Sequence, residues 1–229
     1  MRFDEAVAGN PYPGRGLLLG TTPDGSCSVL AYFLMGRSVN SRNRVLKMVG
    51  EDLMTQAKDP SKLSDPSLIL YEPVHTLEDV VIVGNGDQTD TVRDALQKGG
   101  SFSGALEKRA FEPDAPNYTP RITGVVRIAD GAVQLSILCC PSGDGVHCER
   151  RQYDYAAEPG TARLLHTYRD GRPELPFAGE PVAVETEDDI NAFAQRIWDA
   201  LDADNRISLY VRYTRIGDGG YTDVLINQY

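Results

Sequence analysis

The stretch from Val80 to Thr91, VVIVGNGDQTDT, decides how this chain can fold. Its β-branched run predicts a buried strand, Gly-Asn-Gly predicts a tight turn, and the following VRDALQK predicts a helix. Asp87, Thr89 and Asp90 lie where the turn meets the helix. In one interpretation the glycines make the turn and the acids cap the helix. In the other these polar side chains belong to a site, because loops on a rigid scaffold often carry function.

Upstream of this stretch, the sequence predicts mainly β-structure. Residues 13–20, PGRGLLLG, and residues 28–35, SVLAYFLM, flank the turn signal Thr-Pro-Asp-Gly and predict a hairpin. SLILYEPV, residues 67–74, predicts a strand that ends near Tyr71, and residues 77–83 predict the next strand. The polar segment 51–67 contains two Asp-Pro steps, and we expect a surface excursion or a short helix there.

Downstream, the first helix should stop at Gly99-Gly100, and a second is predicted from Ser103 to Phe111, capped by Ser101 or Ser103. Asp130-Gly131 between two apolar runs predicts another hairpin. Further strands are predicted within residues 150–156, 162–169, 181–186, 206–216 and 221–228.

A third helix is predicted to open at Thr186, with Asp189 completing a capping box. Apolar residues then recur with helical spacing through Trp198, which we place in the core. Many hairpin-linked strands with few helices indicate an α+β protein. We find no repeat, linker or shift in composition, so residues 1–229 are expected to form a single domain.

Composition restricts the functional classes. The 229 residues carry a net charge of −10, which disfavours nucleic acid and anionic membranes as partners. The N-terminus lacks the apolar core of a signal peptide, and no stretch is long enough to span a membrane. The cysteines do not form a disulfide or zinc pattern, so we expect reduced thiols, a cytoplasmic location and no metal site. They are Cys27, Cys139, Cys140 and Cys148.

Basic residues gather in GRSVNSRNRVLK, where Arg37, Arg42, Arg44 and Lys47 fall close together despite the acidic balance. A guanidinium group can bind phosphate or carboxylate through two parallel hydrogen bonds. The alternative is a solvated loop whose arginines pair with surface acids. Cys27 is the best isolated thiol, but no base lies beside it in the sequence.

Four motifs occur in a defined order: GRSVNSRNR, Tyr71, NGDQTDT, and TPRI at residues 119–122. Together with the GRG-LLLG strand and the AY step at Ala31-Tyr32, they resemble the archaeal-type inosine monophosphate (IMP) cyclohydrolases over roughly the first 130 residues. The resemblance implies a four-layer αββα sandwich similar to the N-terminal-nucleophile hydrolases. Because the chain begins Met1-Arg2-Phe3, no N-terminal nucleophile is expected.

The implied reaction closes 5-formamidoimidazole-4-carboxamide ribonucleotide to IMP with loss of water. The substrate carries both nucleophile and electrophile, so orientation, oxyanion stabilisation and proton transfer suffice. No cofactor is required. The expected partner is a purine ribonucleotide, and the protein is a possible homo-oligomer.

Site roles follow from the resemblance. Arg44 matches a catalytic arginine, with Arg42 as a rival two residues away. Tyr71 matches a tyrosine near the base, and Glu112 is the candidate general acid–base. The remaining substrate-binding candidates are Asn85, Asp87, Thr89 and Asp90 in the turn, Asn117 and Arg121 around the Thr-Pro pair, and Arg15 and Arg37.

The acids at the turn argue against phosphate there, although a helix N-terminus attracts anions. We therefore expect ribose hydroxyls or the carboxamide near Asp87 and Asp90. The phosphate is assigned to Arg37, Arg42 and Arg44, with Arg15 or Arg121. Two alternatives stay open: a nucleotide-binding module without turnover, and a cysteine-dependent amidohydrolase that uses Cys27.

Overall fold

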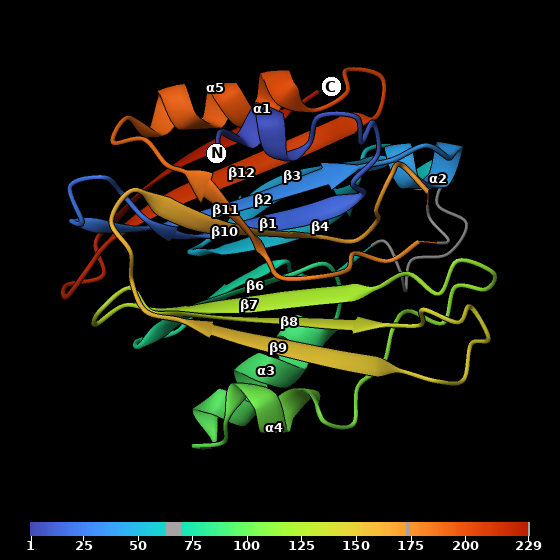
Figure 1. Ribbon diagram of the computed structural model, residues 1–229, viewed down its shortest axis with the longest axis horizontal. Helices are drawn as coiled ribbons and strands as arrows, with labels where there is room; N and C mark the ends of the chain where they lie inside the picture. Colours follow the sequence, from blue (N-terminus) through green and yellow to red (C-terminus); the bar gives the residue numbers. More distant parts are fainter. Residues whose placement is uncertain (63–69, 173–174, 229) are drawn as a thin grey trace.

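The computed structural model describes residues 1–62, 70–172 and 175–228, which form two antiparallel sheets (Figure 1). The six-stranded sheet has the order β11-β10-β1-β2-β12-β13, and the seven-stranded sheet runs consecutively from β3 to β9. The strands of the first sheet are β1 (Arg15–Thr21), β2 (Cys27–Met35), β10 (Thr161–His166), β11 (Val182–Glu185), β12 (Arg206–Arg215) and β13 (Tyr221–Asn227). Those of the second are β3 (Arg44–Val49), β4 (Asp52–Ala57), β5 (Val74–Thr76), β6 (Val80–Gly84), β7 (Arg121–Arg127), β8 (Val133–Cys139) and β9 (Glu149–Tyr155).

Four of the described α-helices lie on the outer faces of the stacked sheets (Figure 1). α1 (Phe3–Ala6) and α5 (Ile190–Ala200) pack on the six-stranded sheet, and α3 (Gln88–Gln97) and α4 (Phe102–Leu106) pack on the seven-stranded sheet. α2 (Val39–Arg42) joins β2 to β3. The predicted α+β class is therefore confirmed. No described helix has the length and apolar character needed to cross a membrane.

The central strands are apolar on both sides because both of their faces are covered. Leu17 and Leu19 of β1 point into the core between the sheets, whereas Leu18 packs toward α5. Such continuous apolar runs are expected where neither face of a strand meets water. The predicted hairpin is confirmed, since β1 pairs with β2 from Arg15–Leu34 to Thr21–Ser28.

The C-terminal helix packs as predicted but begins later. Trp198 lies in the core with the other apolar residues of α5. Asp189, and not Thr186, caps the helix: its carboxylate accepts hydrogen bonds from the backbone N–H groups of Asn191 and Ala192. The Thr186 hydroxyl instead donates to the Thr21 carbonyl of β1, so the capping-box prediction is wrong.

Two predictions between β2 and α4 need correction. Residues 52–57 form strand β4, so a surface excursion or short helix is wrong for them, whereas Pro60–Lys62 form a short exposed 3-10 helix, η1, as expected. Residues 63–67 lie outside the described chain. Leu53 and Thr55 face inward while their neighbours are half-exposed, which is the period-2 pattern of a strand. α4 ends at Leu106 rather than near Phe111, although its predicted cap, Ser101, is confirmed.

The strand expected to end near Tyr71 covers residues 67–69, which lie outside the described chain. Tyr71 itself belongs to no strand, although its backbone bonds to Thr55 of β4. The next strand is also shorter than predicted: Leu77 makes a turn onto Val80, where β6 begins.

A buried arginine links the two sheets. Arg212 of β12 is 1% exposed and uses all three nitrogens of its guanidinium group. Nε donates to the Tyr210 hydroxyl (2.6 Å), Nη1 to the Thr76 hydroxyl (2.7 Å) and Nη2 to the Glu51 carbonyl (2.7 Å). Thr76 and Glu51 belong to the seven-stranded sheet and its β3–β4 turn, so these bonds fix the sheets relative to each other.

Replacing Arg212 by Met is expected to lower the free energy of unfolding by about 3 kcal/mol, because buried acceptors lose their donors. Urea denaturation at pH 7.5 measures the change. The matched control is Arg127→Met, which removes an exposed ion pair with Asp130 and should change stability by less than about 1 kcal/mol. Equal effects of the two substitutions would contradict a linking role for Arg212.

Candidate active site

The candidate site is built around an ion pair between Arg15 and Glu112. Arg15 opens β1, and Glu112 lies in the loop that leads from α4 to β7. Arg15 Nη2 donates to Glu112 Oε1 at 2.6 Å, and both side chains are at least 90% buried. Arg15 Nε has no hydrogen-bond partner within the described residues. A buried donor without a partner is costly, so this nitrogen is suited to bind a ligand atom.

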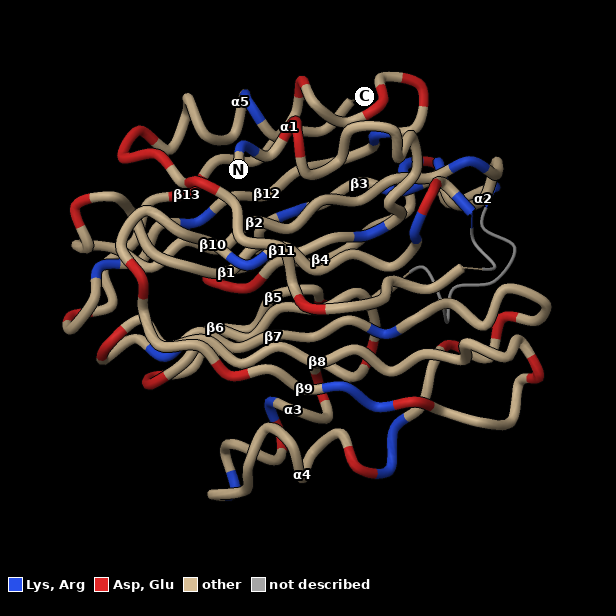
Figure 2. Tube along the Cα trace, in the orientation of Figure 1, with Lys and Arg blue, Asp and Glu red and all other residues tan. Residues whose placement is uncertain are grey.

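The ion pair borders a cavity of about 360 Å³, which is within the usual range for small-ligand sites. The cavity lies next to α2, where Lys and Arg positions gather (Figure 2). Three arginines and two acids line it together with hydroxyl, amide and aromatic groups. The lining residues are Tyr12, Arg15, Arg37, Ser38, Asn40, Ser41, Arg44, Glu112, Asp114, Asn117, Thr119 and Tyr168.

The arginines of the α2 segment are held by specific contacts. Arg44 is 3% exposed, and its Nε donates to the Ser41 carbonyl at 2.9 Å. The Arg37 guanidinium lies 4.0 Å from the centre of the Tyr12 ring and donates to the Gly171 carbonyl. Arg42 points away from the cavity, toward the Asn205 side chain. The structure therefore brings Arg37 and Arg44 together with Arg15 but leaves Arg42 outside.

Ser38 and Ser41 belong to a local cap that shapes this wall. The Ser38 hydroxyl accepts a bond from the Ser41 backbone N–H, and the Ser41 hydroxyl accepts one from the Ser38 backbone N–H. This reciprocal pattern fixes the entry to α2. Both residues line the cavity beside Arg37.

Glu112 is placed for proton transfer. Burial raises the pKa of its carboxyl group above the ordinary value, although the guanidinium groups of Arg15 and Arg121 act in the opposite direction. A carboxyl group whose surroundings raise its pKa is suited to exchange a proton with a bound substrate. The backbone N–H of Glu112 donates to the Thr119 carbonyl, which closes the loop containing Asn117.

The predicted turn residues mostly stabilise the turn. The Asn85 amide donates to the Pro120 carbonyl, and its oxygen accepts from the Ile122 N–H, so Asn85 joins the turn to β7. The Thr89 hydroxyl donates to the backbone carbonyls of Glu72 and Gly86. Neither residue lines the cavity described above.

Asp87 does not cap α3, so the capping interpretation is wrong for this residue. Its carboxylate instead pairs with Arg109 (2.7 Å) and Arg121 (2.6 Å). Burial acts to raise its pKa, but the two arginines outweigh burial and lower it. Since both oxygens already have cationic partners, Asp87 positions Arg121 in the structure.

The turn passes close to these groups at Gly86. A Cβ atom there would lie 2.6 Å from Arg121 Nη1 and 3.6 Å from Glu112 Oε1. Arg121 also donates to the Gln88 side chain at 2.7 Å. The NGDQ turn therefore forms the layer behind Glu112, and Arg121 contributes to the electrostatic environment of that carboxyl group.

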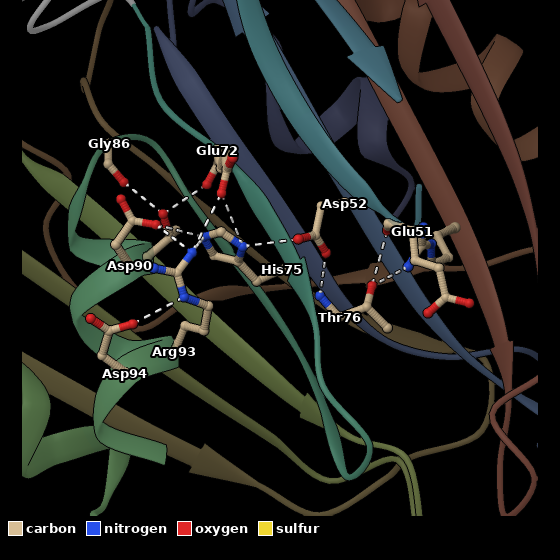
Figure 3. A network of polar contacts seen from close by, with 11 residues as sticks. Glu51, Asp52, Glu72, His75, Thr76, Gly86, Asp90, Arg93 and Asp94 are labelled. Atoms are coloured by element: carbon tan, nitrogen blue, oxygen red, sulfur yellow. Dashed lines mark hydrogen bonds and ion pairs between the residues drawn. The ribbon is translucent and has the colours of Figure 1, made fainter. Parts of the chain in front are cut away.

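Asp90 belongs to a separate network around His75 (Figure 3). His75 Nε2 lies 2.9 Å from Asp90, and Nδ1 lies 3.3 Å from Asp52 and 3.4 Å from Glu72. Burial lowers the pKa of His75, but the carboxylates outweigh burial and the pKa is raised.

Asp52, Glu72 and His75 could together hold a metal ion. Arg93 already pairs with Glu72 (3.5 Å) and Asp90 (2.9 Å), however, so the carboxylates have cationic partners. The hydrogen bonds of His75 and the ion pairs of Arg93 account for the arrangement.

Tyr71 lies beside the His75 network and lines a second cavity, of about 730 Å³. Its hydroxyl lies 2.7 Å from that of Tyr32, a fully buried residue of β2. Arg15 is close enough to interact electrostatically with both phenols. The Tyr32–Tyr71 pair therefore lies between the Arg15–Glu112 cavity and the second cavity.

A family model described as IMP cyclohydrolase-like protein matches residues 12–219. The chain belongs to this family. Two IMP cyclohydrolases of archaea are also similar to it. The enzyme of Methanothrix thermoacetophila is 29% identical over 160 residues, which cover 66% of this chain and 71% of the relative. That of Methanopyrus kandleri is 27% identical over 145 residues, covering 58% and 72%.

The IMP cyclohydrolase-like match extends well past residue 130, where motif resemblance stops. It therefore includes cavity residues that sequence reasoning missed, such as Tyr168, whose hydroxyl lies 2.7 Å from that of Thr119. Tyr12, Tyr32 and His75 were also missed. Tyr32 follows Ala31 in the AY step of the resemblance, and that position was the one available signal for it.

Proposed function

We propose that this member of the family closes 5-formamidoimidazole-4-carboxamide ribonucleotide to IMP with loss of water. The observation that carries this proposal is the buried Arg15–Glu112 pair at the edge of a cavity that also contains Arg37 and Arg44. Such a site offers cations for a phosphate and a carboxyl group for proton transfer. Two relatives carry the name IMP cyclohydrolase.

The phosphate is placed at the α2 side of the cavity. Arg37 and Arg44 supply charge there, and Ser38 and Ser41 line the same part of the cavity. The base then extends toward Arg15, Glu112 and the Tyr32–Tyr71 pair. The free Arg15 Nε would donate to the oxygen that becomes negative during ring closure.

The reaction needs two coupled proton transfers. As the carboxamide nitrogen bonds to the formyl carbon, that nitrogen gives a proton to Glu112 and the formyl oxygen takes one from Tyr71. The resulting hydroxyl group then leaves as water with the proton from Glu112. The formamido nitrogen returns a proton to the Tyr71 oxygen as its double bond forms. Both side chains are thereby restored, and no redox cofactor or metal takes part.

We also propose that residues 1–229 form one domain related to the N-terminal-nucleophile hydrolases. Two stacked antiparallel sheets with helices on their outer faces support this relationship, and the site draws on both sheets. The free cysteines and the proposed metabolic reaction favour the cytoplasm.

The cysteine-dependent alternative receives no support. Cys27 opens β2, whereas Arg15 pairs with Leu34 near the other end of that strand. Leu34 lies seven positions after Cys27 along the strand, which corresponds to about 24 Å. The Cys27 sulfur accepts a hydrogen bond from Ser26, and no histidine bonds to it within the described residues.

The function is tested by incubating the pure protein with the formamido ribonucleotide and following IMP formation. Turnover well above the uncatalysed rate, retained in Cys27→Ala, is expected. Tight IMP binding without turnover would show that the protein is a nucleotide-binding module and not an enzyme. Loss of turnover in Cys27→Ala, with the fold intact, would favour the amidohydrolase alternative.

The phosphate placement predicts different results for two neighbouring arginines. Arg44→Met is expected to raise KM about 30-fold, because a buried charge-assisted contact to the phosphate is lost. Arg42→Met should change KM less than about twofold, because Arg42 points to Asn205. Steady-state kinetics at fixed ionic strength measure both. The reverse pattern would assign the phosphate to Arg42.

A further inference from the structure

Tyr32 is a buried polar residue that the reaction above does not use. It lies on the inner face of β2, is 0% exposed, and packs in the core between the sheets. Its hydroxyl contacts the Tyr71 hydroxyl at 2.7 Å. Arg15 and Arg44, which line the first cavity, both interact electrostatically with Tyr32.

The donor in this contact can be assigned by counting protons. Each phenol has one proton, and burial raises the pKa of Tyr32 well above its ordinary value, so Tyr32 keeps its proton at neutral pH. Among the residues that the structure describes, the Tyr32 hydroxyl has Tyr71 as its hydrogen-bond partner. If Tyr71 were the donor, the Tyr32 proton would be buried without an acceptor, which is costly.

If Tyr32 is the donor, the proton left over belongs to Tyr71. Tyr71 is 7% exposed and interacts electrostatically with Arg15, which lines the first cavity, so its proton can be directed toward a ligand bound beside Arg15. The arginines beside Tyr32 cannot accept a proton, because guanidinium groups only donate hydrogen bonds. The geometry thus favours Tyr32 as the donor and Tyr71 as the acceptor of this hydrogen bond.

We propose that Tyr32 is a positioning residue whose hydroxyl donates to the Tyr71 oxygen and so leaves the Tyr71 proton directed toward the substrate. This inference rests on the proposed function, in which Tyr71 gives a proton to the formyl oxygen. Tyr32 touches no reacting atom. It acts by fixing the rotation of the Tyr71 hydroxyl group.

The test combines three variants of the full chain with the ring-closure assay. Tyr32→Phe is expected to lower kcat about tenfold with KM changed less than about twofold, because only the orientation of the acid is lost. Tyr71→Phe should lower kcat by about 100-fold or more. The double variant should equal Tyr71→Phe, because Tyr32 acts only through Tyr71.

The matched control is Tyr210→Phe, which removes another buried phenol hydroxyl at the position paired with Tyr32. That hydroxyl bonds to Arg212 and Asp223, so its loss should lower stability and leave kcat unchanged. A wild-type kcat in Tyr32→Phe, or a double variant whose losses multiply, would overturn the proposal.

A spectroscopic readout separates this inference from the proposed function. In proton NMR of the protein without ligand, we expect a slowly exchanging hydroxyl signal that disappears in Tyr32→Phe and moves upfield in Tyr71→Phe. A protected signal that belongs to Tyr71 would overturn the assigned direction. If the wild type shows this Tyr32 signal but does not turn over the ribonucleotide, the proposed reaction fails while the assigned donor direction holds.

Discussion

Glu112→Gln is expected to lower kcat by about 10²- to 10⁴-fold, the usual contribution of a general acid–base residue. Glutamine has nearly the same shape and can still accept the hydrogen bond from Arg15, so binding of the ribonucleotide should persist. Because the lost group acts on the reacting atoms, the effect should appear in kcat far more than in KM. Steady-state kinetics of IMP formation measure it.

The role of Glu112 also predicts how the catalytic rate depends on pH. Burial raises the pKa of Glu112, and the carboxylate form must accept the proton of the attacking nitrogen. The wild-type kcat/KM should therefore fall as pH decreases through a value above the usual glutamate pKa of about 4.3. This acidic limb should be absent from the residual activity of Glu112→Gln. Glu107→Gln, at an exposed position, is the matched control and should leave rate and profile unchanged.

Arg15→Met is expected to lower the free energy of unfolding by about 3–5 kcal/mol at neutral pH, because it leaves the buried Glu112 charge without its nearest partner. Burial acts to lower the pKa of Arg15, but Glu112 and the surrounding phenols outweigh burial and raise it, so the arginine stays charged. Urea denaturation and circular dichroism measure the loss. Activity should fall as well, since the Nε donor is removed.

A double variant shows whether charge causes this instability. Adding Glu112→Gln to Arg15→Met removes the uncompensated carboxylate and should restore at least about half of the lost stability. Arg215→Met, which removes an exposed pair with Asp218, should cost less than about 1 kcal/mol. If the double variant is less stable than Arg15→Met, packing rather than charge is responsible.

The strands that sequence predicted well are those in which burial is complete. LLL in β1 and VVIV in β6 are apolar because neither face of these strands meets water. β3 and β4 were missed for the opposite reason. The apolar Val49 of β3 is exposed, and in β4 the polar Thr55 is buried while the apolar Met54 is half-exposed, so the polarity of the residues does not reveal these strands.

The sequence predicted which loops form the site, but it could not predict which side chains contact one another there. Arg42 and Arg44 are two residues apart in one motif, yet the first ends α2 and the second opens β3, so their side chains diverge. Sequence spacing cannot separate them. Tyr168 reaches Thr119 from 49 residues away, and such a pairing depends on how the sheets stack.

The link made by Arg212 has a consequence for mutations far from the cavity. Arg15 extends from one sheet, and Glu112 precedes the strand β7 of the other, so their contact reports the alignment of the two sheets. Apolar contacts alone would let the two sheets shift relative to each other, whereas Arg212 and the Tyr32–Tyr71 pair hold the sheets in register. A substitution that changes the side-chain volume at Leu17 or Leu53 would therefore alter the turnover rate from a distance. A shift of the catalytic groups by about 1 Å can lower the rate by a factor of about 100.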